Sequence, residues 1–542
     1  MSNIRQQIKL PFFMVVFLFL ISVECGLAED YGDAIVVGSI GDARTLVPIL
    51  ASDSASSDIV GMLFNGLVKY DKDINLVGDL ARSWEIEDAG LTIIFHLRDN
   101  VFWHDGYPLT AADVEFTYMK LIDPAVKTPY SGDFERVASL EIIDDYTVKV
   151  RYKEPFSPGL ASWGMAVMPR HVLKNEDLNK TGFSRHPVGC GPYVFKSWKT
   201  QEKIELTANK NYFEGSPYIS RYIYRIIPDE STLFLELSTQ NVDLTGLTPL
   251  QYLRQTDSTF FKQAYRKFRI PSFGFTYLGY NLSDARFKDV RVRKALNLAV
   301  DKNEIIEVVL LGLGRVCSGP FVPESWAYNK EVAVDGYNPS QARELLRQAG
   351  WIDANNDGIL EKEGVEFSFT IITNQGNEQR LKACQIIQNR LAEIGIKVKI
   401  KVLEWSVFLS EYIDKRRFEA VLLGWSLARD PDCFDLFHSS KTKEGEFNFV
   451  GYKNAEVDRL LEEGRRTFDQ EKRKQIYHQI HKIIYDEQPY MFLYVPDSLS
   501  ILHRRFRGVE PAPIGIGYNF IKWWVPQAEQ KYRKYRDGSI FK

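Results

Sequence analysis

Hydrophobic and polar residues alternate with two different periods along the chain, and these periods predict both strands and helices. The segment Ile396–Leu403 (IKVKIKVL) alternates apolar residues with lysines, the period-two pattern of a strand with one buried face. Residues 378–394 have helical spacing and are followed by Gly395, a residue favoured just after a helix. Segments of both kinds alternate almost throughout, which predicts an α/β architecture.

Three further helices are predicted from the residues at their ends. Asn338 is typical of an N-cap, and Gly350 ends the apolar pattern that follows it. Asp301 precedes Glu304 by three residues, the spacing of a capping box. Thr110 stands before another helical pattern, AADVEFTYMKL. We therefore expect helices to begin after Asn338, Asp301 and Thr110.

The length of the chain predicts more than one structural unit. At 542 residues it is too long for one ordinary hydrophobic core, so two or three lobes are expected. No internal repeat, low-complexity segment or linker-like composition interrupts it. The lobes are therefore expected to be joined by strands that cross between them.

The N-terminus has the pattern of a secretory signal peptide. Arg5 and Lys9 precede a short apolar run, Pro11–Val23, and small residues allow cleavage after Ala28. The run is shorter than the roughly 20 apolar residues of a membrane span, and no comparable run follows. Residues 1–28 are therefore predicted to be removed from an exported, periplasmic protein.

Cys25 raises the alternative of a lipid anchor on the N-terminal cysteine of a lipoprotein. Glu24 occupies the position at which such signals have a small residue. The lipid anchor is accordingly the less favoured interpretation.

Composition narrows the class of protein. Hydrophobic residues make up 45% and charged residues 26%, the balance of a folded soluble protein. The formal net charge is −3 and no basic block occurs, which argues against nucleic acid as a partner. Aromatic residues are frequent at 13%, and such residues often line ligand sites. Four cysteines remain after cleavage and permit up to two disulfides in three connectivities: Cys190, Cys317, Cys384 and Cys433.

Motifs for catalysis or metal binding are incomplete. Asp353–Gly364 begins like a calcium loop, but Gly364 stands where a bidentate Glu should close the coordination shell, so a polar turn is favoured. His478 and His481 share one face of a predicted helix, without a carboxylate or Cys pattern to complete a metal site. No nucleophile, base or zinc-protease signature is present. We expect no metal, no cofactor and no enzymatic activity, which leaves a binding protein.

Several longer segments together resemble the extracellular solute-binding proteins of family 5, the oligopeptide, dipeptide and nickel receptors of ABC importers. They run in order along nearly all of the mature chain, and the resemblance is greatest to the oligopeptide-binding members. The segments are TLVPILASDSASSDIVGMLFNGLVKYD, FWHDGYPLTAADV, HPVGCGPYVFKSW, YLGYNLSDARFKDVRVRKALNLAVDKNEII, LGWSLARDPDCFDLFHSS and QPYMFLYVPDSL.

The resemblance implies a type II periplasmic-binding-protein fold with two lobes, an extra inserted domain and a ligand cleft between the lobes. It implies that a peptide is enclosed in the cleft and delivered to a membrane permease by a monomeric receptor. The expected division is residues 29–58, 187–280 and 498–542 for the first lobe, 59–186 for the inserted domain, and 281–497 for the second lobe.

The resemblance also nominates residues of the cleft. Trp425 and Gly424 are expected to form its floor and Trp405 a second aromatic wall, whereas Tyr130 matches a tyrosine that faces ligand. Other nominated residues lie on the strand that enters the second lobe, at the edge of the first lobe and in the loop LGWSLARDPDCF: Tyr277, Asn281, Asp42 (within 40–42), Arg429 and Asp430.

One position departs from the family pattern. Several members place an Asp three or four residues after the cleft tryptophan, where it pairs with the α-amine of the peptide. Leu427, Ala428 and Arg429 follow Trp425 here, and the first acid is Asp430. Asp430 and Asp432 are therefore open to structural roles, such as capping of the next helix by Asp432. Arg429 is open either to a carboxylate partner or to solvation.

Two alternatives to an oligopeptide receptor remain open from the sequence. One is a receptor of the same family for a different ligand, such as a dipeptide or a nickel chelate. The other is a ligand-binding sensor module that docks on a membrane receptor in place of a permease.

Overall fold

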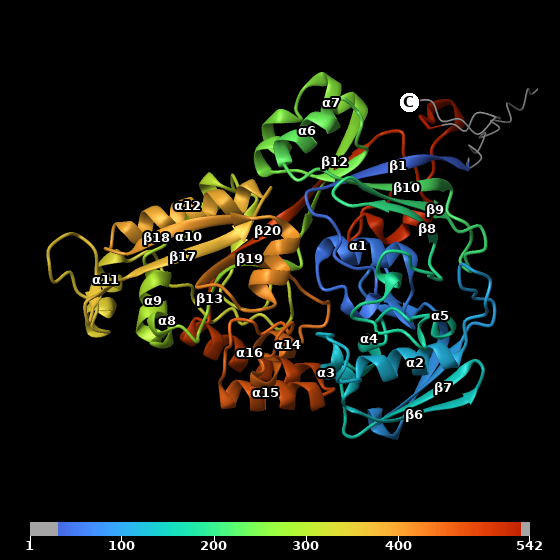
Figure 1. Ribbon diagram of the computed structural model, residues 1–542, viewed down its shortest axis with the longest axis horizontal. Coiled ribbons are helices and arrows are strands. Elements are labelled where there is room, and N and C mark those ends of the chain that lie inside the picture. Colours follow the sequence, from blue (N-terminus) through green and yellow to red (C-terminus); the bar gives the residue numbers. More distant parts are fainter. Residues whose placement is uncertain (1–30, 533–542) are drawn as a thin grey trace, which may run out of the picture.

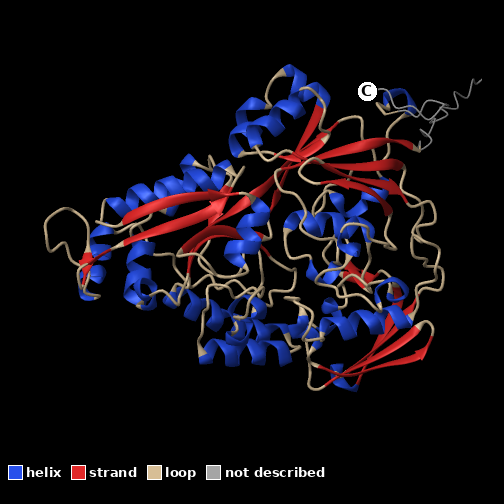
Figure 2. Cartoon of the chain, viewed as in Figure 1, coloured by secondary structure: helices blue, strands red, loops and turns tan. Residues whose placement is uncertain are grey.

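The computed structural model describes residues 31–532, so the predicted signal peptide and Cys25 lie outside the described residues. Two lobes lie side by side and are connected at one end by long strands (Figure 1). Strands form the centre of each lobe, with helices on their faces (Figure 2). The predicted multi-domain α/β architecture is confirmed.

The largest sheet in residues 31–532 contains twelve strands and extends through both lobes. Its order is β18-β17-β19-β13-β20-β11-β1-β10-β9-β8, and β12 and β14 also pair with β20. The strands are β1 (Gly32–Ser39), β8 (Tyr193–Lys199), β9 (Lys203–Ala208), β10 (Ile219–Ile226), β11 (Leu244–Gly246), β12 (Tyr265–Pro271), β13 (Gly274–Tyr280), β14 (Gly314–Val316), β17 (Ser368–Asn374), β18 (Lys397–Leu403), β19 (Ala420–Ser426) and β20 (Tyr490–His503).

We call the part built on β1 and β8–β12 lobe I, and the part built on β13, β14 and β17–β19 lobe II. Strand β20 belongs to both. Its first half pairs with β13 and β14, and its second half pairs with β11 and β12. Strands β12 and β13 also follow each other directly, separated by Ser272 and Phe273. The expectation that strands cross between the lobes is confirmed.

A separate antiparallel sheet lies below lobe I in Figure 1, and we call this part the inserted region. Its strand order is β4-β5-β7-β6, and α2 packs against β6 and β7. Helix α2 begins after Thr110, which forms the predicted cap as a capping box with Asp113. The elements of this region are β2 (Val68–Tyr70), β3 (Leu76–Gly78), β4 (Ala81–Glu87), β5 (Thr92–Leu97), α2 (Ala111–Leu121), α3 (Ser131–Phe134), β6 (Val137–Asp144), β7 (Thr147–Tyr152), α4 (Gly159–Ser162) and α5 (Arg170–Leu173).

Helices cover the sheet of lobe II, and α10, α11 and α12 begin where the sequence predicts. Asn338 caps α11 by accepting a hydrogen bond from Gln341 N (3.0 Å). Asp301 caps α10, but Glu304 pairs with Arg390 (2.8 Å) in place of closing the expected capping box. The helices are α8 (Ala285–Lys288), α9 (Val290–Leu298), α10 (Lys302–Val308), α11 (Pro339–Gln348), α12 (Glu378–Ala392), α13 (Trp405–Val407), α14 (Phe434–Phe437), α15 (Ala455–Arg466) and α16 (Gln470–Glu487); a short hairpin, β15 (Glu361–Lys362) with β16 (Val365–Glu366), follows α11.

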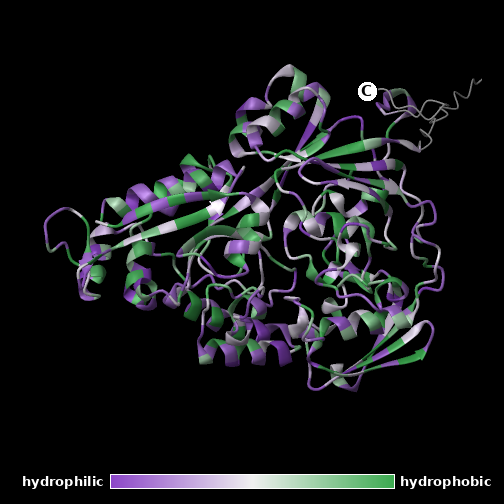
Figure 3. Ribbon diagram, in the orientation of Figure 1, coloured by the Kyte–Doolittle hydropathy of each residue, from purple (hydrophilic) through white to green (hydrophobic). Residues whose placement is uncertain are grey.

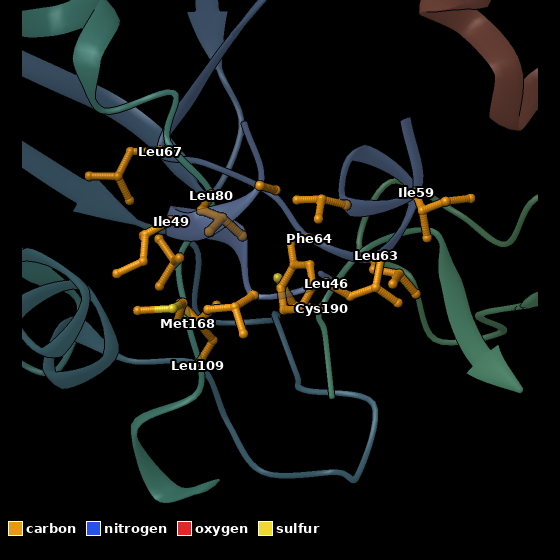
Figure 4. Packing of buried hydrophobic residues seen from close by; sticks show 14 of the residues in the cluster. Leu46, Ile49, Ile59, Leu63, Phe64, Leu67, Leu80, Leu109, Met168 and Cys190 are labelled. Atoms are coloured by element: carbon orange, nitrogen blue, oxygen red, sulfur yellow. The ribbon is translucent and has the colours of Figure 1, made fainter. Parts of the chain in front are cut away.

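Lobe I carries three helices of its own, α1 (Ser54–Leu63), α6 (Glu230–Ser238) and α7 (Thr259–Ala264). The inward face of α1 contributes Ile59 and Leu63 to the core shared by lobe I and the inserted region, where Leu63 lies near Leu46 (Figure 4). Hydrophilic residues line the outer helices, most clearly α15 at the lower edge of Figure 3. The core therefore fixes α1 in place while its opposite face is left for other contacts.

Candidate ligand-binding site

A cavity of about 1250 Å³ lies between the lobes. Its walls come from α1 and β2, from the α3–α4 part of the inserted region, from the ends of β13 and β19, and from the loop after β19. The volume exceeds the range of most small-molecule pockets, roughly 300–1,000 Å³. The site can therefore enclose a ligand of several linked units.

Trp425, at the end of β19, forms an aromatic wall of this cavity. Its ring lies 5.4 Å from Phe447 and 5.5 Å from Phe449, and it stacks on Tyr277 at 6.3 Å. Tyr277 is fully buried behind it and stacks in turn on Tyr490 at 4.2 Å. The nominated Tyr277 is thus the support of the wall, while Trp425 presents the accessible surface.

Trp405 and Tyr130 also line the cavity, as nominated. Trp405 belongs to lobe II, and its Nε1 donates to Asp53 Oδ1 of lobe I at 3.5 Å. Tyr130 donates its hydroxyl to Ala51 O (2.8 Å), and its ring meets Phe447 edge-on at 5.6 Å. Both rings therefore lie where the two sides of the cleft approach each other.

Gly424 lines the cavity next to Trp425 and has a steric role. A Cβ at this position would lie 3.0 Å from Arg380 Nη2 and 3.2 Å from Phe275 O. Glycine thus leaves room for the guanidinium of Arg380 at the cavity wall. Arg380 is the third residue of α12 and donates to Asn374 Oδ1 (2.8 Å).

The two acids of the loop after β19 are held by arginines. Asp430 forms a two-point ion pair with Arg473, with both N–O distances at 2.7 Å. Asp432 accepts from Arg465 at 2.6 Å and from Phe434 N at the start of α14 (3.2 Å). Both acids line the cavity, but these bonds give them structural roles in the loop. Asp432 was expected to cap the next helix, but Cys433 is the N-cap residue of α14 and Asp432 stands one position before it.

Besides Tyr277, three other nominated residues lie outside the cavity lining. Asp42 accepts from Trp198 Nε1 (3.0 Å) and Gln201 N (2.8 Å). Asn281 donates to Phe418 O (2.9 Å) in lobe II. The guanidinium of Arg429 lies 3.8 Å over a ring of lobe II, that of Phe273. The structure therefore brings together Trp425, Gly424, Trp405, Tyr130 and Asp430, but not these three.

Most charges that face the cavity are already paired within the protein. Arg44 of lobe I forms an ion pair with Asp414 of lobe II at 2.6 Å. Lys69 of the inserted region forms ion pairs with Asp79 and Glu214. Among the described residues, Asp53, Asp58 and Arg380 line the cavity with no opposite charge within ion-pair distance, and Asp53 is occupied as the cap of α1, where it accepts from Ser56 N. Asp58 and Arg380 were not predicted from the sequence, because nothing in the chain marks which charges will find a partner after folding.

The four cysteines of residues 31–532 are buried, and none forms a disulfide. Burial raises the pKa of the Cys190, Cys317 and Cys384 thiols to about 12, which keeps them protonated. No group of His, Cys, Asp or Glu in the described range is arranged to hold a metal. The same range contains no helix that is long and apolar enough to cross a bilayer.

Comparison with known proteins places this geometry in a family. Residues 75–446 match the model of the bacterial extracellular solute-binding proteins, family 5 (middle region). The chain belongs to this family. The family membership confirms the resemblance of the sequence, and its extracellular character agrees with the expected export.

Individual relatives match over most of the chain. The oligopeptide-binding protein AppA of Bacillus subtilis is 36% identical over 512 residues, which cover 92% of this chain and 93% of AppA. A structure of that protein in complex with a nonapeptide has a TM-score of 0.88, covering 92% of this chain and 99% of the other. NikZ of Campylobacter jejuni in complex with Ni(L-His) has a TM-score of 0.82 at 29% identity, covering 91% and 99%. The expected fold class is thereby confirmed.

Proposed function

We propose that the chain is the substrate-binding component of an ABC importer and that it captures oligopeptides between its two lobes. The observation that carries this proposal is the interlobe cavity of about 1250 Å³ in a chain 35% identical to AppA, whose structure contains a nonapeptide. Aromatic walls give contact area without requiring one ligand sequence. Bridging waters can fill the space left by smaller side chains at little cost.

Within this function, Trp425, Gly424, Trp405 and Tyr130 contact the ligand. Closure of the lobes buries the peptide, and the closed monomer delivers it to a membrane permease. The protein works in the periplasm after export and has no catalytic role. No cofactor or nucleic acid takes part.

The proposed domain division follows the expectation from the sequence. Residues 29–58, 187–280 and 498–542 form lobe I, residues 59–186 the inserted domain and residues 281–497 lobe II. The antiparallel sheet β4–β7 (residues 81–152) falls within the inserted domain, which supports the bounds of that domain. Strand β13 (Gly274–Tyr280) pairs with β19 and β20, which favours a boundary between the lobes near residue 273 in place of 280.

Native mass spectrometry of freshly purified protein, followed by acid release, tests the function. A ladder of peptides carried by the protein is the expected result, and Trp425→Ala protein purified in parallel should retain less of it. A single non-peptide mass or a nickel complex would contradict the oligopeptide proposal. The residues that line the cavity include no histidine, so the described site offers no imidazole ligand to a nickel chelate.

A further inference from the structure

The strongest unassigned feature of the cavity is an unpaired carboxylate, Asp58. It lies in the middle of α1 on the side that faces the cavity, one residue before Ile59, which points into the core. Among the described residues no donor forms a hydrogen bond or ion pair with it. Its accessible surface is therefore turned toward the space that the ligand fills.

The surroundings of Asp58 disfavour an isolated negative charge. Loss of bulk water around the side chain, and then the neighbouring Asp53, raise its pKa to about 6. Tyr222 and Tyr224 on β10 interact electrostatically with Asp58, and their own pKa values lie well above 10, so both stay neutral. Within residues 31–532 no cation compensates this carboxylate, so a cation of the ligand would gain most by binding there.

The two acids of the loop after β19 are less suited to bind a cation of the ligand. Asp430 is engaged at two points by Arg473, and Asp432 is engaged by Arg465. An ammonium group at either acid would have to compete with a buried arginine. Asp58 has no such competitor.

We propose that Asp58 binds the free α-ammonium group of the peptide ligand. This assignment rests on the proposed function. The unpaired guanidinium of Arg380, on the lobe II side of the same cavity, supplies the opposite charge for an anionic group of the ligand. A zwitterionic chain thus contacts one unpaired charge on each lobe, which favours the closed form over the open one.

The test compares two synthetic peptide mixtures of graded length, one with free amino termini and one N-acetylated. Each is offered to wild type, to Asp58→Asn and to Asp99→Asn, whose exposed carboxylate lies outside the cavity lining. Bound peptides are quantified by mass spectrometry. Wild type and Asp99→Asn should prefer free amines by about 10- to 100-fold, the effect of one charge-assisted hydrogen bond. Asp58→Asn should bind both mixtures alike.

Thermal unfolding of the same three proteins separates binding from folding. Because Asp58 has no hydrogen-bond or ion-pair partner in the described part of the chain, Asp58→Asn should unfold at the wild-type temperature or above it. Two results would overturn the assignment of Asp58 but leave the oligopeptide function standing. One is an Asp58→Asn protein that keeps the amine preference, and the other is a wild type that binds peptides without any amine preference. A wild type that binds neither mixture would overturn the oligopeptide function, and the assignment with it.

Discussion

Arg465 connects the two sides of the cleft, and its removal should weaken both the fold and the closed state. Its side chain is 1% exposed, and Nη2 lies 2.6 Å from Asp432 of lobe II and 2.8 Å from Asp133 of the inserted region. Its guanidinium also lies 3.7 Å over the ring of Phe434. Burial raises the pKa of the nearby Asp435 to about 6, while the charges of Lys441 and then Arg465 oppose this rise, so a third acid also interacts with Arg465. The perturbation is Arg465→Met, which keeps an unbranched apolar stem and removes the charge.

The expected magnitude follows from the acids left behind. Removal of one partner from a buried ion pair costs about 3–5 kcal/mol, because the remaining charge is uncompensated. Opening of the cleft returns Asp133 to water, so part of this cost appears as a shift toward the open form. If the closed form is destabilised by about 3 kcal/mol relative to the open form, peptide affinity drops roughly 100-fold.

Urea unfolding measures the effect on the fold, and calorimetry with a bound peptide pool measures the effect on affinity. X-ray scattering of the same samples reports the open fraction. Arg459→Met is the matched control on α15, because Arg459 is exposed and its partners Glu456 and Glu463 are exposed as well. That change should stay within about 0.5 kcal/mol. Arg465→Met with wild-type stability and affinity would refute the reasoning, and lost stability with unchanged affinity would confine Arg465 to the fold.

Four other outcomes are expected. Trp425→Ala should weaken peptide binding by more than about 1 kcal/mol in calorimetry, with an unchanged unfolding midpoint. Asp430→Asn should lower stability by roughly 1–3 kcal/mol in urea, because it breaks the pair with Arg473, yet leave the preference for free amines intact. Affinity for free-amine peptides should fall as pH drops through about 6, because protonated Asp58 no longer attracts an ammonium group, whereas acetylated peptides should show no such titration. The thiols of residues 31–532 should resist maleimide in the native protein and all react after denaturation, as intact-mass measurement without reductant will show.

The elements that depend on local chemistry were predictable from the sequence. Asn338 and Thr110 begin helices as expected, because a cap needs only residues within the next turn. Glu304 was expected to complete such a cap, but it pairs with Arg390, which is 86 positions away. Periodicity carries no information about a partner at that distance.

The candidate site shows the same contrast between residues that were predictable from the local sequence and residues whose roles depend on distant partners. The resemblance placed Trp425 at the cavity because the segment LGWSLARDPDCF resembles a motif of the family. Asp430 was nominated with it, but its role was left open, since its partner Arg473 is contributed by a separate helix. Asp58 was missed because a charge becomes notable only when its neighbours are known, and those come from α1, β10 and the opposite lobe.

Strand β20 has a consequence for the order in which the chain can fold. It completes the sheet of lobe II with its first half and the sheet of lobe I with its second, and it lies near the C-terminal end of the chain. Neither lobe can close its hydrophobic core until this strand has been synthesised. The two lobes are therefore expected to gain their final stability together, late in synthesis, and a chain truncated before residue 490 would leave both incomplete.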